Sequence, residues 1–338
     1  MTKQSLIGFT LLCICLSFAG CDSTNQTTQV QDIAELRWEA DGSALFGFIQ
    51  SYTQTLTSVI PGIGYDIAKF GTDGSLTKTF TLDPKSVADY STSLFLSSDG
   101  NTAVTQLEGD LYRYSLKTGS LEKLQQLFHL IVVSPDLHYA VGSPSPAIQH
   151  FKTIIVYDIT ASPLRIVTQF DLPKLVASSG IWLANGMFGI TYSDSIGNHV
   201  SIFDTTGALR QTIGGAEILF HNVVYNPQTN DLFFRNRAGA FTDGSVDKVN
   251  LTTLVRTNVL KDSVDNFDVT RDENVIIYSK YDGNEELISK NLQTGNTLQI
   301  ANDIRLIITL SPAEDRLAYI RKRDDHFNEV HVIPFTRP

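Results

Sequence analysis

Two histidines precede a proline by the same number of residues, in segments of similar sequence. His129 begins the stretch HLIVVSP and His221 begins HNVVYNP, so each histidine lies six residues before its proline, Pro135 or Pro227. An imidazole titrates near neutral pH, and it can transfer protons, bind an anion or coordinate a metal ion. The chemistry that the pair supports depends on whether the fold brings the two histidines together.

The segments that contain these histidines belong to a repeat that extends over most of the chain. Each copy shows an apolar strand, a tight polar turn, a second strand, a loop, a third strand and a turn into a fourth. The first turn of the seven copies is marked by Asp41, Asp99, Asp136, Asn185, Asn230, Asp272 and Glu314. Six steps separate residue 41 from residue 314, which gives a mean period of 45.5 residues.

A period of about 40 to 50 residues with four short strands is typical of a β-propeller blade. A single blade cannot bury both faces of its sheet, but stacking blades around an axis covers them and protects the edges. The seven copies predict an all-β, seven-bladed propeller of four-stranded antiparallel blades over residues 33–338. The last copy ends at Pro338 after its third strand, and we expect residues near Gln29 to Ile33 to supply the missing outer strand.

Two Ser-Pro turns carry a resemblance to known propellers. Ser134-Pro135 precedes the strand YAV, and Ser311-Pro312 precedes the strand LAYI. These repeats resemble the TolB-like and WD-like propeller repeats of bacterial envelope proteins, and the seven-bladed lactonase-type propellers. The resemblance covers about residues 34–336 and implies architecture. It implies two function classes, a rigid platform that binds protein or glycan partners and a hydrolase of the lactonase type.

The propeller places both histidines where the innermost strand of a blade begins, at one mouth of the central channel. The equivalent positions in the other copies are Ala34, Thr92, Ser178, Asp265 and Leu306, with Arg305 beside the last. We therefore predict a candidate site of His129, His221, Asp265 and Arg305, suited to acid–base chemistry, anion binding or metal binding. The alternative interpretation is that these side chains satisfy strand ends around a water-filled channel.

Other motifs that carry chemistry are missing from the sequence. It has no G-x-S-x-G elbow, P-loop, H-E-x-x-H or cysteine-based metal site, and we expect no cofactor. The net charge of −10 disfavours nucleic acid as a partner, because cationic contacts to phosphates dominate that binding. Trp38, Trp182 and the phenylalanine-rich strands fit packing between sheets.

The N-terminal segment is typical of export. Lys3 precedes a mostly apolar run from Leu6 to Gly20, which is too short to span a bilayer comfortably and fits a secretory signal. Phe18-Ala19-Gly20-Cys21 then resembles the bacterial lipobox. That resemblance implies cleavage before Cys21 and attachment of acyl chains such as palmitate, and two or three chains give stable membrane anchoring. A plain signal peptide and an uncleaved anchor are the alternatives.

These observations predict three regions and one favoured function. Residues 1–20 form a lipoprotein signal peptide, residues 21–32 a lipidated cysteine and polar tether, and residues 33–338 the propeller. We expect a protein held in the bacterial cell envelope by its lipid, facing the periplasm or the exterior. There it acts as a rigid module that binds an envelope protein, a glycan or another ligand. The alternative is a channel-mouth hydrolase that uses His129, His221, Asp265 and Arg305.

Overall fold

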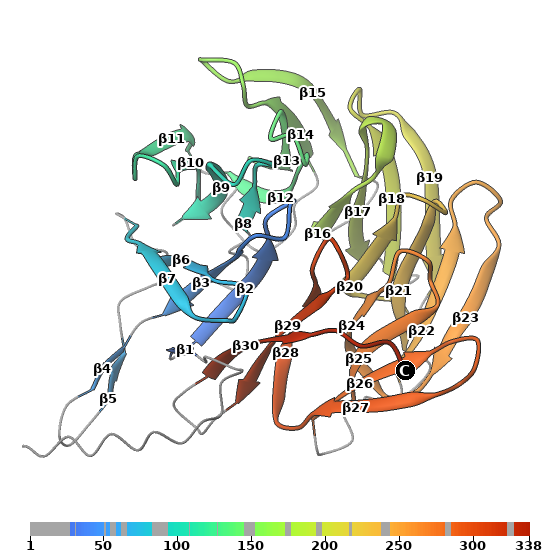
Figure 1. Cartoon of the computed structure of the whole chain (residues 1–338). Helices are drawn as coiled ribbons and strands as arrows, with labels where there is room; N and C mark the ends of the chain where they lie inside the picture. The colour runs from blue at the N-terminus through green and yellow to red at the C-terminus, as the bar shows by residue number, and fades with distance from the viewer. Residues whose placement is uncertain are drawn as a thin grey trace, which may run out of the picture.

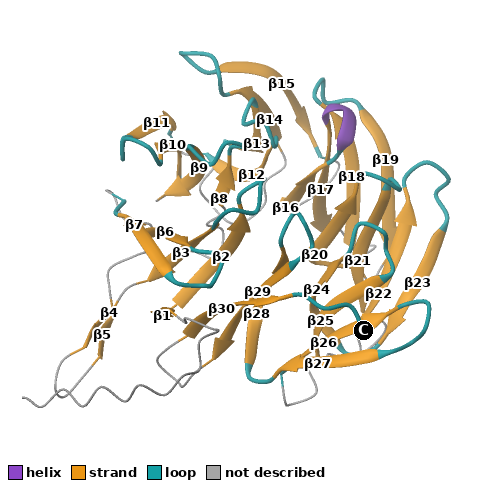
Figure 2. Ribbon diagram, viewed as in Figure 1, coloured by secondary structure: helices purple, strands orange, loops and turns teal. Residues whose placement is uncertain are grey.

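The computed structural model describes residues 28–30, 32–50, 52–54, 59–61, 66–82, 94–107, 109–126, 128–144, 153–172, 177–193, 198–215, 218–237, 244–280, 285–322 and 328–338. The predicted signal peptide and Cys21 lie outside these residues. Within the described ranges the chain is all β, apart from one 3-10 turn, η1 (Ala184–Gly186) (Figure 2). None of its described helical structure is long and apolar enough to cross a bilayer.

Seven four-stranded antiparallel sheets form the blades of a ring (Figure 1). Blade 1 consists of β2 (Asp32–Trp38), β3 (Leu45–Gln50), β6 (Asp66–Phe70) and β7 (Leu76–Phe80). Blade 2 consists of β8 (Leu94–Leu96), β9 (Thr102–Leu107), β10 (Asp110–Ser115) and β11 (Leu121–Gln125). Blade 3 consists of β12 (His129–Val133), β13 (Tyr139–Ser143), β14 (Thr153–Asp158) and β15 (Arg165–Asp171).

The second half of the ring repeats the same order. Blade 4 consists of β16 (Ala177–Trp182), β17 (Met187–Ser193), β18 (Asn198–Asp204) and β19 (Leu209–Gly215). Blade 5 consists of β20 (Ile218–Asn226), β21 (Asp231–Arg237), β22 (Gly244–Asn250) and β23 (Arg256–Lys261). Blade 6 consists of β24 (Val264–Val269), β25 (Val275–Lys280), β26 (Glu286–Asn291) and β27 (Thr297–Ala301). The predicted seven-bladed propeller is confirmed.

Blade 7 joins the two ends of the chain. Its strands are β28 (Ile304–Leu310), β29 (Arg316–Lys322), β30 (Asn328–Pro334) and β1 (Thr28–Val30). Thr28 pairs with Val330 and Val30 with Asn328, so an N-terminal strand closes the ring. Closure by an N-terminal outer strand was expected, but the strand begins at Thr28, and Ile33 belongs instead to β2 of blade 1. A separate hairpin of β4 (Tyr52–Gln54) and β5 (Val59–Pro61) is inserted between β3 and β6.

Apolar residues fill the space between every pair of neighbouring blades. Seven clusters of buried side chains lie among the described residues, one for each junction around the ring. At the junction of blades 1 and 2, for example, Phe46, Phe48 and Phe80 pack against Leu94 and Tyr112. Burial of each such aromatic side chain contributes about 2–3 kcal/mol. Since every junction has its own cluster, the stabilising core is distributed around the ring.

The two ends of the channel are built differently. Turns from the first to the second strand, and from the third to the fourth, lie at one end of each blade, which we call the turn end. Gly119, Gly207 and Gly295 have positive φ in the second kind of turn, as their Thr-Gly sequences predict. The connections between blades lie at the opposite end, which we call the loop end.

Candidate functional site

The four residues of the predicted site lie on innermost strands. The first strands of neighbouring blades contact one another and surround the centre of the ring (Figure 1). His129 begins β12, and His221 lies in β20, Asp265 in β24 and Arg305 in β28, so the residues belong to blades 3, 5, 6 and 7. Each of the four residues lies in the first half of its strand, toward the loop end of the blade.

The innermost strands share an irregularity at this level. The register between first and second strands shifts between Leu219 and Val223 in blade 5, and between Val264 and Phe267 in blade 6. It also shifts between Ile304 and Ile308 in blade 7. His221, Asp265 and Arg305 therefore lie within bulged segments. A bulge re-aims side chains and ends regular pairing. Blades 1, 3 and 4 have a register shift between the same two strands, so the bulge is a general feature of the repeat.

The side chains of the predicted site are described in part. His129 is buried, with 8% of its surface exposed. Asp265 accepts a hydrogen bond from Arg235 Nη1 of blade 5, at 2.9 Å from Oδ1, and this ion pair joins two blades. The side chains of His221 and Arg305 are outside the described part of the structure. Convergence of the four side chains at one mouth stays a prediction.

Arg235 is a residue that the sequence did not single out. Within the described ranges its buried Nε has no hydrogen-bond partner, and a Cβ on Gly244 would lie only 2.6 Å from that atom. Gly244 therefore leaves the space that the guanidinium occupies. The only sequence signal for Arg235 is a charge that follows the apolar run LFF in a second strand. Among the described residues, no cluster of three His, Cys, Asp or Glu side chains is arranged to hold a metal ion.

A pocket of about 340 Å³ lies at the turn end of the channel. We call it the channel pocket. The innermost strands of five blades line it, through Arg37 and Trp38, Leu94–Leu96, Val132–Pro135, Gly180–Trp182 and Val223. Most of these residues have aliphatic or aromatic side chains, while backbone groups and Ser134 also give the wall polar surface. Among the described lining residues, Arg37 carries the only charged side chain. Ligand pockets in proteins commonly have this size and this composition.

Both tryptophans of the chain line the channel pocket, and each is held in place. Trp38 donates a hydrogen bond from Nε1 to the carbonyl oxygen of Thr309 in blade 7, at 3.2 Å. Trp182 stacks on Tyr139 of blade 3, with ring centroids 6.1 Å apart and planes at 5°. It also stacks on Phe188, at 5.7 Å. Packing between sheets, which the sequence predicted, therefore also orients the indoles toward a pocket.

A signal for the channel pocket was present in the sequence. Trp38 and Trp182 each lie one residue before the first turn of their repeat. That turn begins at Glu39 in blade 1 and at Leu183 in blade 4. The N–H groups of these two residues donate hydrogen bonds across the turn to the carbonyl oxygens of Ala44 and Met187. Two large aromatics at one repeat position of innermost strands point to a shared surface around the axis.

Arg37 is oriented by two neighbours. Its Nε donates a hydrogen bond to Glu35 Oε1 at 2.6 Å, and its guanidinium carbon lies 5.9 Å from the centre of the Phe95 ring. The second oxygen of Glu35 accepts the backbone N–H of Leu94 in blade 2, also at 2.6 Å. Glu35 therefore joins two blades and holds the cation, while 54% of the Arg37 side chain remains exposed.

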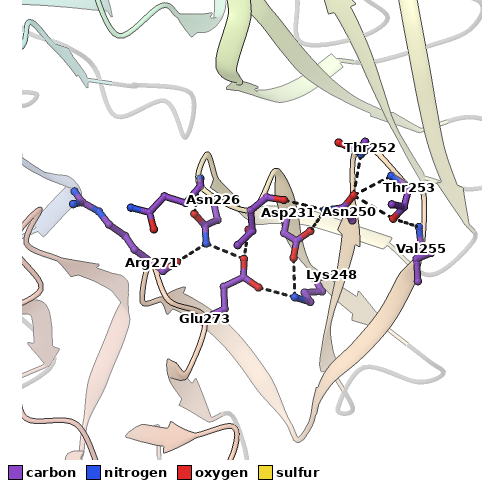
Figure 3. A network of polar contacts seen from close by, with 11 residues as sticks. Asn226, Asp231, Lys248, Asn250, Thr252, Thr253, Val255, Arg271 and Glu273 are labelled. Atoms are coloured by element: carbon purple, nitrogen blue, oxygen red, sulfur yellow. Dashed lines mark hydrogen bonds and ion pairs between the residues drawn. The ribbon is translucent and has the colours of Figure 1, made fainter.

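A polar network at the turn end of blades 5 and 6 has a structural role (Figure 3). Lys248 Nζ lies 2.7 Å from Asp231 and 2.6 Å from Glu273, which also accepts a hydrogen bond from Asn226. Burial opposes the charge on Lys248, but its hydrogen bonds to both carboxylates outweigh burial and raise its pKa. Lys248 is thus paired with two carboxylates, and the network connects blades 5 and 6. Arg271 takes part through its backbone carbonyl oxygen, which accepts a hydrogen bond from Asn226.

Comparison with known proteins shows the fold. The chain matches no family model and no curated protein. Among solved structures, an oligogalacturonate lyase in complex with manganese has a TM-score of 0.66 at 11% identity, over 91% of both chains. Hydrazine synthase of Kuenenia stuttgartiensis has a TM-score of 0.66 at 12% identity, covering 94% of this chain and 100% of the other. The Cps50 (Swd1) β-propeller domain of Myceliophteria thermophila has 0.65 at 13%, covering 92% and 99%.

Proposed function

We propose that this chain is a lipid-anchored envelope propeller that acts as a rigid binding module, with the channel pocket as its ligand site. The observation that carries the proposal is the pocket itself, about 340 Å³ lined by Trp38, Phe95 and Trp182. Its walls come from the innermost strands of five blades. Because both indoles are fixed by contacts to neighbouring strands, a ligand would meet a surface that is already ordered, and preorganisation reduces the cost of binding.

The lipid anchor would keep this module close to a membrane. The lipobox-like sequence places the acylated residue at Cys21, and β1 begins at Thr28. Seven residue steps can span at most roughly 25 Å. The outer edge of blade 7, where β1 pairs with β30, would therefore remain within that distance of the lipid. A partner or ligand of the envelope is then the natural occupant of the pocket.

Anilinonaphthalene sulfonate, an aromatic dye that fluoresces in apolar sites, tests occupancy of the channel pocket. The two tryptophans are the only ones in the chain and both line the pocket, so energy transfer from tryptophan to dye reports binding there. We expect saturable transfer with one site per chain. Removing both donors abolishes transfer wherever the dye binds, so Trp38→Phe/Trp182→Phe is measured by direct excitation of the dye, and we expect this variant to bind the dye more weakly.

A matched control distinguishes the pocket from the surface. Leu209 and Val255 are exposed apolar side chains on other elements, at 57% and 58% exposure. Leu209→Ser/Val255→Ser should leave energy transfer unchanged. Dye binding that depends on these two residues, or that occurs without transfer from tryptophan, would contradict the proposal.

The second candidate function is hydrolysis at the loop end. The supporting observation is that His129, His221, Asp265 and Arg305 all lie on innermost strands. The double variant His129→Ala/His221→Ala distinguishes the two candidate functions. Loss of turnover on a panel of lactones and esters, with the fold intact, would favour an enzyme. Unchanged dye binding by the same variant would show that the channel pocket is independent of these histidines.

A further inference from the structure

We propose that the channel pocket selects a carboxylate carried on an aromatic or apolar body, with Arg37 binding the carboxylate. This inference rests on the proposed function and names the ligand class of the same pocket. Among its described lining residues the pocket offers one charged side chain, a guanidinium, beside side chains that are mostly aliphatic and aromatic. A ligand that matches both parts has one anionic group at the edge of an apolar ring or chain.

The hydrogen bonding of Arg37 leaves donors for a ligand. A guanidinium has five N–H donors, and among the described residues the bond that Arg37 makes is from Nε to Glu35. The two outer nitrogens, Nη1 and Nη2, form the pair that binds a carboxylate through two parallel hydrogen bonds. More than half of the side chain is exposed, so a ligand can reach this edge.

Glu35 engages one edge of the Arg37 guanidinium, so the pair has no net charge, but among the described residues the edge formed by Nη1 and Nη2 has donors left for a ligand. One of its oxygens accepts from Arg37 and the other accepts the backbone N–H of Leu94, so this carboxylate is shared between two donors. Phe95 lies beneath the guanidinium and restricts its position without adding charge. Arg37 is therefore a positioned cation, and Glu35 is a positioning residue.

The apolar part of the pocket sets the size of the ligand. A volume of about 340 Å³ equals the liquid volume of roughly eleven water molecules. That space fits a single aromatic ring with a short acidic side chain. Trp38 and Trp182 come from blades 1 and 4, and the aromatic surface that they expose to the pocket favours contact with a ring.

Two sources supply this chemistry, a small aromatic acid and the C-terminal residue of a polypeptide with an aromatic side chain. Phenylacetate represents the first source. An acetylated tripeptide that ends in phenylalanine with a free carboxylate represents the second. Phenylacetamide and the same tripeptide with a terminal amide are the neutral controls, because they keep the ring and lose the charge.

The experiment measures displacement of the dye, followed through energy transfer from tryptophan, for these four compounds. We expect at least one acid to displace the dye at roughly tenfold or more lower concentration than its amide, since a hydrogen bond to a charged group contributes about 1.5–3 kcal/mol. Arg37→Gln should abolish the preference for the acid, and Arg37→Lys should retain part of it. Arg165→Gln, which removes an exposed arginine paired with Asp158 outside the pocket, should change nothing.

The outcomes separate this inference from the function on which it rests. A preference for the tripeptide acid identifies a polypeptide C-terminus as the source, and a preference for phenylacetate identifies a small molecule. Equal displacement by acid and amide, or a preference that survives Arg37→Gln, would overturn the carboxylate proposal while the pocket stays a ligand site. Dye transfer that is absent from the unmodified protein would overturn the binding function itself.

Discussion

Asp268 is expected to make the stability of the ring depend on pH. It lies in β24, the innermost strand of blade 6. Its Oδ2 accepts the backbone N–H of Leu310 in blade 7 at 2.9 Å, and its Oδ1 accepts the N–H of Val269 at 2.8 Å. Burial raises the pKa of this carboxyl to about 6, from 3.8 for an ordinary aspartate, and the nearby charge of Glu314 adds to the effect.

The direction in which stability changes with pH follows from the proton that Asp268 takes up when the chain folds. Between pH 4 and pH 6 the folded chain holds a proton on Asp268 that the unfolded chain releases, so the contribution of this group to stability falls as pH rises. A difference of about two pKa units corresponds to roughly 3 kcal/mol. Above pH 6 the folded chain carries this full cost, because the carboxylate is then ionised in a poorly solvated position.

Asp268→Asn should remove the cost of the poorly solvated charge and introduce a smaller cost, the loss of one hydrogen-bond acceptor. An amide oxygen replaces one of the two acceptors, so one backbone N–H, of Leu310 or Val269, loses its partner at a cost of about 1 kcal/mol at every pH. The variant should therefore be more stable than the unmodified protein at pH 7, by about 2 kcal/mol at most. At pH 4 it should be less stable, by about 1 kcal/mol.

Urea unfolding followed by circular dichroism between pH 4 and pH 7.5 gives the two stability curves. Other titratable groups contribute equally to the free energy of unfolding of both proteins, so their contributions cancel in the difference. His331, for example, has a pKa lowered by burial, so its contribution to stability rises with pH in both. Parallel curves, with a difference that does not change sign, would refute the argument about Asp268.

Three further predictions concern the anchor, ring closure and blade packing. Cys21→Ser should abolish lipidation, and the protein should no longer partition with membranes into detergent; membrane association that survives a high-salt wash would contradict a lipid anchor. Deleting residues 22–27 should leave the melting temperature unchanged, whereas deleting residues 22–30 removes the strand that pairs with β30 and should lower it; equal melting temperatures would refute closure by β1. Gly142→Ala should cost about 1–3 kcal/mol or more in urea unfolding, because its Cβ would clash with the backbone carbonyl oxygen of His129, and an unchanged midpoint would contradict this packing.

The repeat was readable from the sequence because its signals are local. Turn residues recur at a fixed period, and Gly119, Gly207 and Gly295 adopt the positive φ that their turns require. The position of the closing strand was less well predicted. Thr28–Val30 pairs with a strand three hundred residues away, and no local pattern fixes that register. Ile33, assigned to the closing strand, is instead buried at the start of blade 1.

The site was harder to predict than the fold. Counting from the first turn of each repeat correctly placed His129, His221 and Asp265, and Arg305 beside the counted Leu306, on innermost strands. The same counting could not show that Asp265 pairs with Arg235 of the neighbouring blade, because that contact crosses between sheets.

The channel pocket depends on where ring closure places residues that are distant in sequence. Trp38 and Trp182 share a repeat position, but only the closed ring shows that a cavity lies between the strands that carry them. Arg37 gave no signal of its own. Its role depends on Glu35 and Phe95, which fix the guanidinium at the pocket wall.

The most direct test of the account is fluorine NMR of the protein labelled with fluorotryptophan. The chain contains two tryptophans, so the spectrum has one resonance for Trp38 and one for Trp182, which single Trp→Phe variants assign. If the channel pocket is the ligand site, both resonances should shift during a titration with whichever acid displaces the dye, and the two shifts should give the same dissociation constant. Binding measured by calorimetry without movement of either resonance would place the ligand elsewhere on the protein and contradict the account.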